Sequence, residues 1–220
     1  QMNILQTAAG QSGLSLEELS AAALAVGGDT RLVGIDASQA AEALTGLYKA
    51  GLDTGDIFGD LNGYLNEGAE LSGALRAAVD LQAASELDLA TASDVVAVAM
   101  ATFGLSAEEA THIADNFVQT ADASVASVPE LADALANVGP SARAFGLSLE
   151  ETNLALGLLS ERGIRGAEAG TALKSMLVNM SRDTAEVRQA WEALGISLYD
   201  SGGQMRSLPV VIAELEQALA

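Results

Sequence analysis

The chain has 220 residues, of which 50% are apolar and only 4% aromatic, and its ten Lys and Arg against thirty Asp and Glu give a formal net charge of −20. This charge, without any cluster of basic residues, argues against binding to nucleic acid or to an anionic membrane, because a phosphate backbone attracts Lys and Arg. The chain has no cysteine, which excludes disulfides and thiolate metal sites.

The apolar content comes largely from alanine, which favours helices over strands. The longest stretches without a charge, residues 1–16 and 95–107, are shorter than the roughly 18 to 20 apolar residues of a membrane-spanning helix. Because the first residue is Gln1 rather than an initiator methionine, we expect the chain to be a segment of a longer protein. The composition predicts a mostly helical module without a membrane span and leaves its compartment open.

A short motif, GLSxEE, predicts three helix starts, at residues 13–18, 104–109 and 146–151. Its glycine ends the preceding helix, because glycine enters the left-handed conformation at little cost. Its serine is the N-cap of the next helix, and the glutamate three residues later returns a hydrogen bond, which makes a capping box. The predicted boxes are Ser15 with Glu18, Ser106 with Glu109 and Ser148 with Glu151.

Looser versions of the motif predict further helix boundaries. An Asp or Ser N-cap precedes a polar or acidic residue by three positions, and Pro129 stands in the first turn of one such helix, where its missing N–H costs little. These starts are Asp36 with Gln39, Asp53 with Asp56, Ser127 with Glu130, and Asp88. The glycines expected to end helices are Gly13, Gly34, Gly51, Gly104, Gly146, Gly163 and Gly195.

Between these boundaries apolar residues recur with the period of a helix. The clearest stripes are Ala92, Val96, Ala99, Met100 and Phe103; Ala110, Ile113, Ala114, Phe117 and Ala121; and Ala169, Leu173, Met176, Leu177 and Met180. We therefore predict an all-α fold of about nine or ten short to medium helices. The exception is a small β-hairpin near residues 196–206, where Ile196, Leu198 and Met205 flank a DSGG turn.

We expect residues 1–220 to form a single helical module, with possible sub-halves at residues 1–86 and 87–220. The segments 34–51 and 146–163 share five of eighteen residues, but the other boundaries are unevenly spaced, unlike those of a solenoid. An old duplication and shared helix-capping chemistry both remain open as explanations.

His112 is the only histidine, so any Ser-His-Asp scheme would pass through it. The neighbouring Glu108 and Asp115 favour surface ion pairs instead. The acidic run 53–67 resembles an EF-hand loop, but Phe58 and Ala69 would occupy the two most important ligand positions. We therefore expect neither a catalytic histidine nor a calcium site.

The glycines in this run recur every four residues, as Gly51, Gly55, Gly59 and Gly63. Such a ladder allows close helix packing, and the intervening acids equally favour a frayed, loop-like helix. The paired carboxylates Glu17–Glu18 and Glu150–Glu151 fit helix starts, where the helix dipole favours negative charge. Adjacent helical residues do not face each other across a substrate, and Glu161 near a helix end is expected to be exposed.

Trp191 continues an apolar face with Val187 and Leu194, and we predict that it belongs to a core or an interface. No residue of the sequence is predicted to be catalytic, to bind a cofactor or to bind a metal.

The ordered combination of these segments is more specific than any single helix start. The run VGPSARAFGLSLEETNLALGLLSERGIRGAEAGTALKSMLVNM, residues 138–180, resembles the core region of phage tail tape measure proteins. The segment WEALGISLYDSGGQMRSLPVVIAEL, residues 191–215, looks like the closing hairpin and helix of that family, and LYKAGLD at 47–53 and VAVAMATFGLSAEEA at 96–110 also look like its pattern. Residues 55–84 resemble it least.

The resemblance implies a structural role without cofactors: tape measure proteins occupy the tail lumen during assembly, set tail length and leave ahead of the DNA on infection. It implies as partners other copies of the chain, tail tube proteins and tail assembly chaperones. It places the protein in the virion, made in the cytoplasm of the bacterial host from a phage or prophage gene. A helical interaction or scaffold module, a host-directed effector and, distantly, a hydrolytic tail enzyme using Glu161 are the alternatives.

Overall fold

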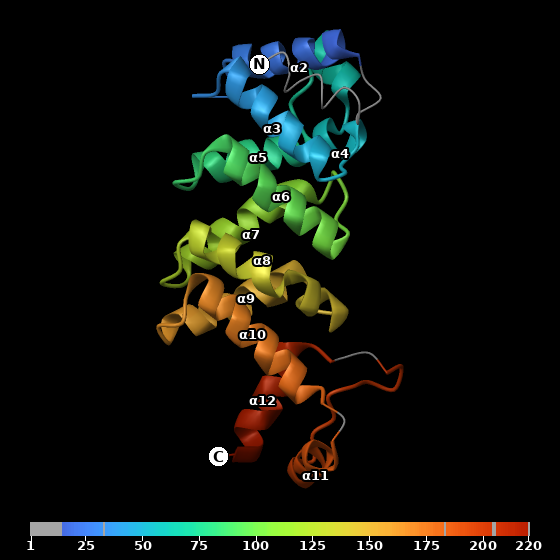
Figure 1. Ribbon diagram of the computed structural model, residues 1–220, viewed down its shortest axis with the longest axis vertical. Coiled ribbons are helices and arrows are strands. Elements are labelled where there is room, and N and C mark those ends of the chain that lie inside the picture. Colours follow the sequence, from blue (N-terminus) through green and yellow to red (C-terminus); the bar gives the residue numbers. More distant parts are fainter. Residues whose placement is uncertain (1–14, 33, 183, 204–205, 220) are drawn as a thin grey trace. The chain divides into compact units, whose positions relative to one another are not determined.

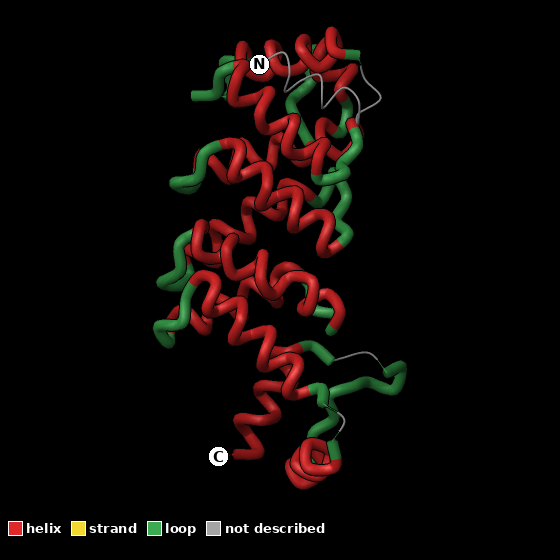
Figure 2. The backbone as a smooth tube through the Cα atoms, in the orientation of Figure 1, coloured by secondary structure: helices red, strands yellow, loops and turns green. Residues whose placement is uncertain are grey.

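The computed structural model describes residues 15–32, 34–182, 184–203 and 206–219. In these ranges it contains eleven α-helices and one π-helical turn, and no β-strand (Figure 1, Figure 2). The all-α prediction is confirmed in its main part, although nine or ten helices was too low a number. No described helix is long and apolar enough to span a membrane.

The chain divides into two compact units, residues 1–119 and 120–220, and each is described here by itself. The prediction of one module with sub-halves 1–86 and 87–220 stays a prediction. The first unit contains α2 (Leu16–Gly28), α3 (Ala37–Lys49), α4 (Thr54–Phe58), η1 (Gly63–Glu67), α5 (Gly73–Ala83), α6 (Leu89–Phe103) and most of α7 (Ala110–Asp122).

Helix α3 is central to the first unit, because it packs against α2, α5 and α6, while α5 also packs on α4 and α6. Small residues keep these helices close: Ala40, Ala41 and Ala43 of α3 are all buried, beside the fully buried Leu44 and Leu47. Most residues of the predicted apolar stripes of α6 and α7 are buried as well, Met100 and Phe117 among them. Alanine-rich stripes thus give the close packing that their small volume allows.

The second unit contains α8 (Val128–Ala144), α9 (Leu149–Glu161), α10 (Gly166–Met180), α11 (Ala185–Leu194) and α12 (Leu208–Leu219). Helices α8 and α10 make the closest pair, and α9 packs on both. Gly170 permits this approach, because a Cβ there would collide with the backbone carbonyl of Ala134. Around Gly170, the predicted stripe residues Ala169, Leu173 and Leu177 are buried.

Local capping chemistry sets most helix boundaries, as the sequence predicted. Complete capping boxes join Ser15 to Glu18, Asp36 to Gln39, Asp53 to Asp56, Ser127 to Glu130 and Ser148 to Glu151. Asp88 accepts from the backbone N–H of Thr91. Six of the seven predicted glycines, all except Gly13, have positive φ, and Gly13 lies outside the described residues.

The helix predicted to follow Ser106 begins later in the chain than the motif indicates. The N–H of Ser106 donates to the Glu109 carboxylate at 2.9 Å, but residues 107–109 form turns and α7 begins only at Ala110. The GLSxEE motif therefore marks the region of a helix start without fixing its first residue in every copy.

The prediction of a β-hairpin at residues 196–206 is wrong. Residues 200–203 do turn as predicted, and the Arg206 N–H donates to the Leu198 carbonyl at 2.9 Å, but the described part of this segment contains no strand. A two-stranded ribbon without further strands is marginal in water, and here Ile196 and Leu198 bury their side chains against helices instead. Met205, on the other arm, lies outside the described residues.

Candidate functional site

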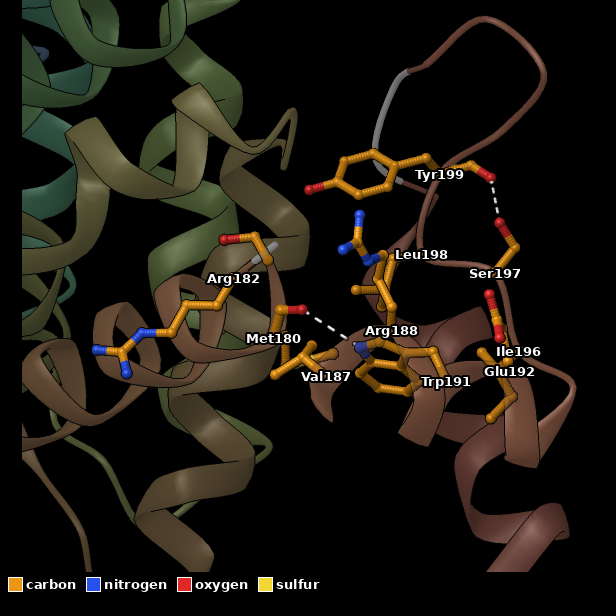
Figure 3. A pocket seen from close by; sticks show the side chains of 11 residues that line it. Met180, Arg182, Val187, Arg188, Trp191, Glu192, Ile196, Ser197, Leu198 and Tyr199 are labelled. Atoms are coloured by element: carbon orange, nitrogen blue, oxygen red, sulfur yellow. Dashed lines mark hydrogen bonds between the residues drawn. The ribbon is translucent and has the colours of Figure 1, made fainter. Parts of the chain in front are cut away.

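The second unit contains an apolar groove. It lies between the end of α10, helix α11 and residues 196–199, and has a volume of about 420 Å³ (Figure 3). Its lining residues are Met180, Ser181, Arg182, Val187, Arg188, Trp191, Glu192, Ile196, Ser197, Leu198 and Tyr199.

The indole of Trp191 forms one wall of this groove. Its Nε1–H donates to the backbone carbonyl of Met180 at 3.3 Å, which joins α11 to the end of α10 (Figure 3). Trp191 is half-buried and packs on a small cluster formed by Ile196, Leu198 and Val211. The prediction of a core or interface position for Trp191 is confirmed, because its ring both packs on this cluster and lines the groove.

Helix α11 is incompletely covered, since none of its residues is fully buried although its apolar residues share one face. Thr184 caps its start, and Gly195 ends it in the left-handed conformation, so that the chain turns back under Trp191. A helix of this kind leaves an apolar face for another surface to cover.

Arg206 fastens the segment after α11 to α12. Its guanidinium donates to both carboxylate oxygens of Glu214, at 2.6 and 2.9 Å, and also to the Ser197 carbonyl at 2.9 Å. The bidentate contact lowers the pKa of the Glu214 carboxyl and raises that of Arg206. The floor of the groove is thereby tied to α12.

The rim of the groove carries charges of both signs, Arg182 and Arg188 with Glu192. Figure 3 shows Arg188 extending from α11 toward the ring of Tyr199, while Arg182 points away from Trp191. Tyr199 is 42% exposed, so its ring is available at the open side. An apolar floor with charged groups at its rim can receive an apolar side chain or another apolar ligand.

Arg182 also lines a second cleft, of about 460 Å³, on the other side of α10. This cleft is polar and includes no acidic residue: its lining residues are Asn137, Thr171, Lys174, Ser175, Val178, Asn179 and Arg182. The apolar groove and the cationic cleft therefore adjoin at one residue.

An acidic cleft of about 580 Å³ in the first unit is lined by Asp53, Asp56, Asp60 and Glu108. Asp53, Asp56 and Asp60 belong to the run that resembles a calcium loop, and Glu108 lies in the turn before α7. Asp53 accepts from the backbone N–H of Asp56, and Asp60 accepts from that of Gly63 at 2.9 Å. Among the residues that the structure describes, no group of three or more His, Asp or Glu is placed to hold a metal ion.

The glycine ladder in this run does not build one continuous helix. Gly59 ends the five-residue α4 with a positive φ, and Gly63 begins the π-helical turn η1. Of the two interpretations offered for the ladder, the structure favours the broken, loop-like helix.

The remaining candidate residues lie apart from any cleft with catalytic geometry. His112 is exposed on α7, and Glu17, Glu150 and Glu161 are exposed on α2 and α9. Glu151 does make a contact far along the chain, because its carboxylate accepts from the Ser207 hydroxyl at 2.6 Å. That hydrogen bond joins the start of α9 to the start of α12 and so holds the two helices together.

Asp29, Arg31 and Tyr64 form a polar junction that the sequence did not reveal. Arg31 binds both carboxylate oxygens of Asp29 and the Ala69 carbonyl, and the Tyr64 hydroxyl donates to Asp29 at 3.2 Å. The contact with Arg31 lowers the pKa of Asp29 to about 2, while burial and the adjacent Asp29 charge raise that of Tyr64 to about 12. The junction holds the chain after α2 against η1.

This junction predicts a measurable pH dependence. Because the pKa of Asp29 is about 2 in the folded state and ordinarily 3.8, its ionised form stabilises the fold above pH 3.8. That contribution is lost as the pH falls through about 2. We expect Asp29→Asn to reduce the loss of unfolding free energy between about pH 4 and about pH 2, measured by urea titrations. Arg31→Gln should reduce it too; unchanged slopes in both variants would contradict the assignment.

The chain folds as a helical module with an apolar groove in its second unit. The three clefts differ in character: the groove is mainly apolar, the cleft beside it is polar and basic, and the cleft of the first unit is acidic. A sequence signal for the groove did exist in Trp191, the only tryptophan, on the exposed amphipathic helix α11. The two arginines of its rim were not predicted, because Arg182 follows α10 whereas Arg188 lies on α11.

Comparison with known proteins assigns this module to a family. The model of a family described as phage-related minor tail protein matches residues 20–220. The chain therefore belongs to the phage-related minor tail protein family, as its resemblance to tape measure proteins predicted.

Two relatives carry more particular names. A tape measure protein of Pneumococcus phage Dp-1 is 33% identical over the whole chain, which covers 18% of that relative. A probable tape measure protein of Escherichia phage P2 is 31% identical over 114 residues, which is 52% of this chain and 14% of that relative. The chain thus spans less than a fifth of the length of these relatives. No solved structure matches it.

Proposed function

We propose that the chain is a structural segment of a phage tail tape measure protein, located in the tail lumen of the virion. In this role it helps set tail length and assemble the tail tube, and it leaves ahead of the DNA on infection. The observation that carries the proposal is the 33% identity to a tape measure protein over all 220 residues. The structural partners are other copies of the chain, tail tube proteins and tail assembly chaperones.

The geometry supports a structural task over an enzymatic one. The carboxylates weighed as catalytic candidates are exposed or cap helices, and Glu161 lies exposed at the end of α9. The acidic surface also suits a protein that precedes DNA through a tube, because like charges repel. We propose that the segment is not an enzyme.

Tail length provides the direct test. In-frame deletion of residues 128–180 from the parent gene should shorten tails by up to about 80 Å, at about 1.5 Å per helical residue. Tails are measured by electron microscopy of purified particles, and their protein content by mass spectrometry. Replacing the deleted residues with an unrelated helical segment of equal length should restore the length. Tails of unchanged length, or virions that lack the peptides of this chain, would overturn the proposal.

A further inference from the structure

A second exposed feature of the same unit matches the groove in chemistry. Helix α9 buries one face, but Leu154 and Leu158 are 50% and 58% exposed. Glu150 and Glu161 are exposed on the same side, because positions 150, 154, 158 and 161 follow the spacing of one helical stripe. We call these four residues the α9 stripe: two leucines one turn apart between two carboxylates about 16 Å apart along the helix.

The groove presents the complementary arrangement. Its walls are apolar side chains, chiefly Trp191, Val187 and Leu198. Of its three charged lining residues, Glu192 is acidic and the other two, Arg182 and Arg188, are arginines. Lys174 extends the positive charge into the adjoining cleft, which includes no acid. Seven of the ten basic residues of this acidic chain fall in residues 120–220, so the groove lies in the part best able to receive carboxylates.

We propose that the α9 stripe of one copy of the chain docks in the Trp191 groove of a second copy. The two leucines cover the apolar walls, and Glu150 and Glu161 reach the rim of the groove, where Arg182 and Arg188 lie. Such a contact joins two different surfaces, so it repeats head to tail and builds an extended assembly or a ring rather than a closed symmetric pair. This docking proposal rests on the proposed function, in which several copies of the chain share one tail. It adds which two surfaces of the chain make the contact between copies.

Trp191 reports on the groove directly, because it is the only tryptophan of the chain. A synthetic peptide with the sequence of α9, LEETNLALGLLSE, should shift and saturate its fluorescence in the 220-residue protein. The same peptide with serine in place of Leu154 and Leu158 should leave the fluorescence unchanged. Binding of the two peptides with equal affinity, or no binding of the first, would overturn the proposal.

Complementation between two variants tests the surfaces in the whole chain. Leu154→Ser with Leu158→Ser removes the stripe, and Arg182→Glu with Tyr199→Ser alters the groove; all four side chains are exposed, so folding should persist, as checked by circular dichroism. Each double variant alone should self-associate at least about tenfold more weakly than the wild type in sedimentation velocity. Mixed, they should form dimers that do not extend, because one intact stripe and one intact groove remain.

Leu24→Ser is the matched control, because Leu24 is 65% exposed on α2 and belongs to neither surface. Its self-association should equal that of the wild type. A wild-type chain that stays monomeric, or a mixture that does not restore dimers, would refute the docking. Either result leaves the tail role intact as long as the peptides of the chain are found in virions, so the two proposals fail separately.

Discussion

Leu44→Ala should lower the free energy of unfolding by about 2–5 kcal/mol. Leu44 is completely buried in α3, the helix that α2, α5 and α6 all contact. Its truncation removes apolar area from the core and leaves a cavity that close-packed helices fill only in part. Urea or guanidinium unfolding, followed by circular dichroism, measures the effect.

Leu24→Ala is the control for this change, since it is the same substitution on the neighbouring helix α2. Leu24 is 65% exposed, and an alanine there costs no helix propensity. We expect its effect to stay within about 0.5 kcal/mol. Equal losses in the two variants would show that α3 is not the centre of the first unit.

Gly170→Ala should destabilise the second unit by about 1–3 kcal/mol, although alanine favours helices more than glycine does. The added Cβ would collide with the Ala134 carbonyl and would lie 2.9 Å from the Cβ of Asn137. Since the obstacle is the backbone of α8 rather than the end of a flexible side chain, the two helices must move apart. Thermal or denaturant unfolding of the variant tests this.

Gly28→Ala makes the matched comparison for this second prediction. Gly28 is the last residue of α2, and a Cβ added there meets nothing within 4 Å. The alanine should be neutral or stabilising by up to about 1 kcal/mol, because it reduces the entropy of the unfolded chain. A neutral Gly170→Ala variant would mean that α8 and α10 are not packed backbone to backbone.

Where the sequence predicted structure well, the determining interactions are local. A capping box needs only residues within three positions of one another, and a left-handed glycine needs only its own missing Cβ. The boxes at Ser15, Ser127 and Ser148 therefore formed as predicted. The resemblance to tape measure proteins used the order of such segments, which is also visible in the sequence alone.

Predictions that depended on distant neighbours were less successful. The segment 196–206 had the pattern of a hairpin, but Ile196 and Leu198 pack against helices, and the described part of the segment forms no strand. Local propensity gives way where burial against another element stabilises a different conformation.

By itself, the sequence determined the fold class, most helix ends, the family and the lack of thiol chemistry, because these follow from composition and from contacts between near neighbours. Only the tertiary structure decided which apolar faces stay exposed. It left Leu154 and Leu158 uncovered on α9, joined Asp29 to Tyr64 across the first unit, and set two arginines beside Trp191. The physical reason is that exposure depends on which helices meet, and helical periodicity alone does not specify the neighbour.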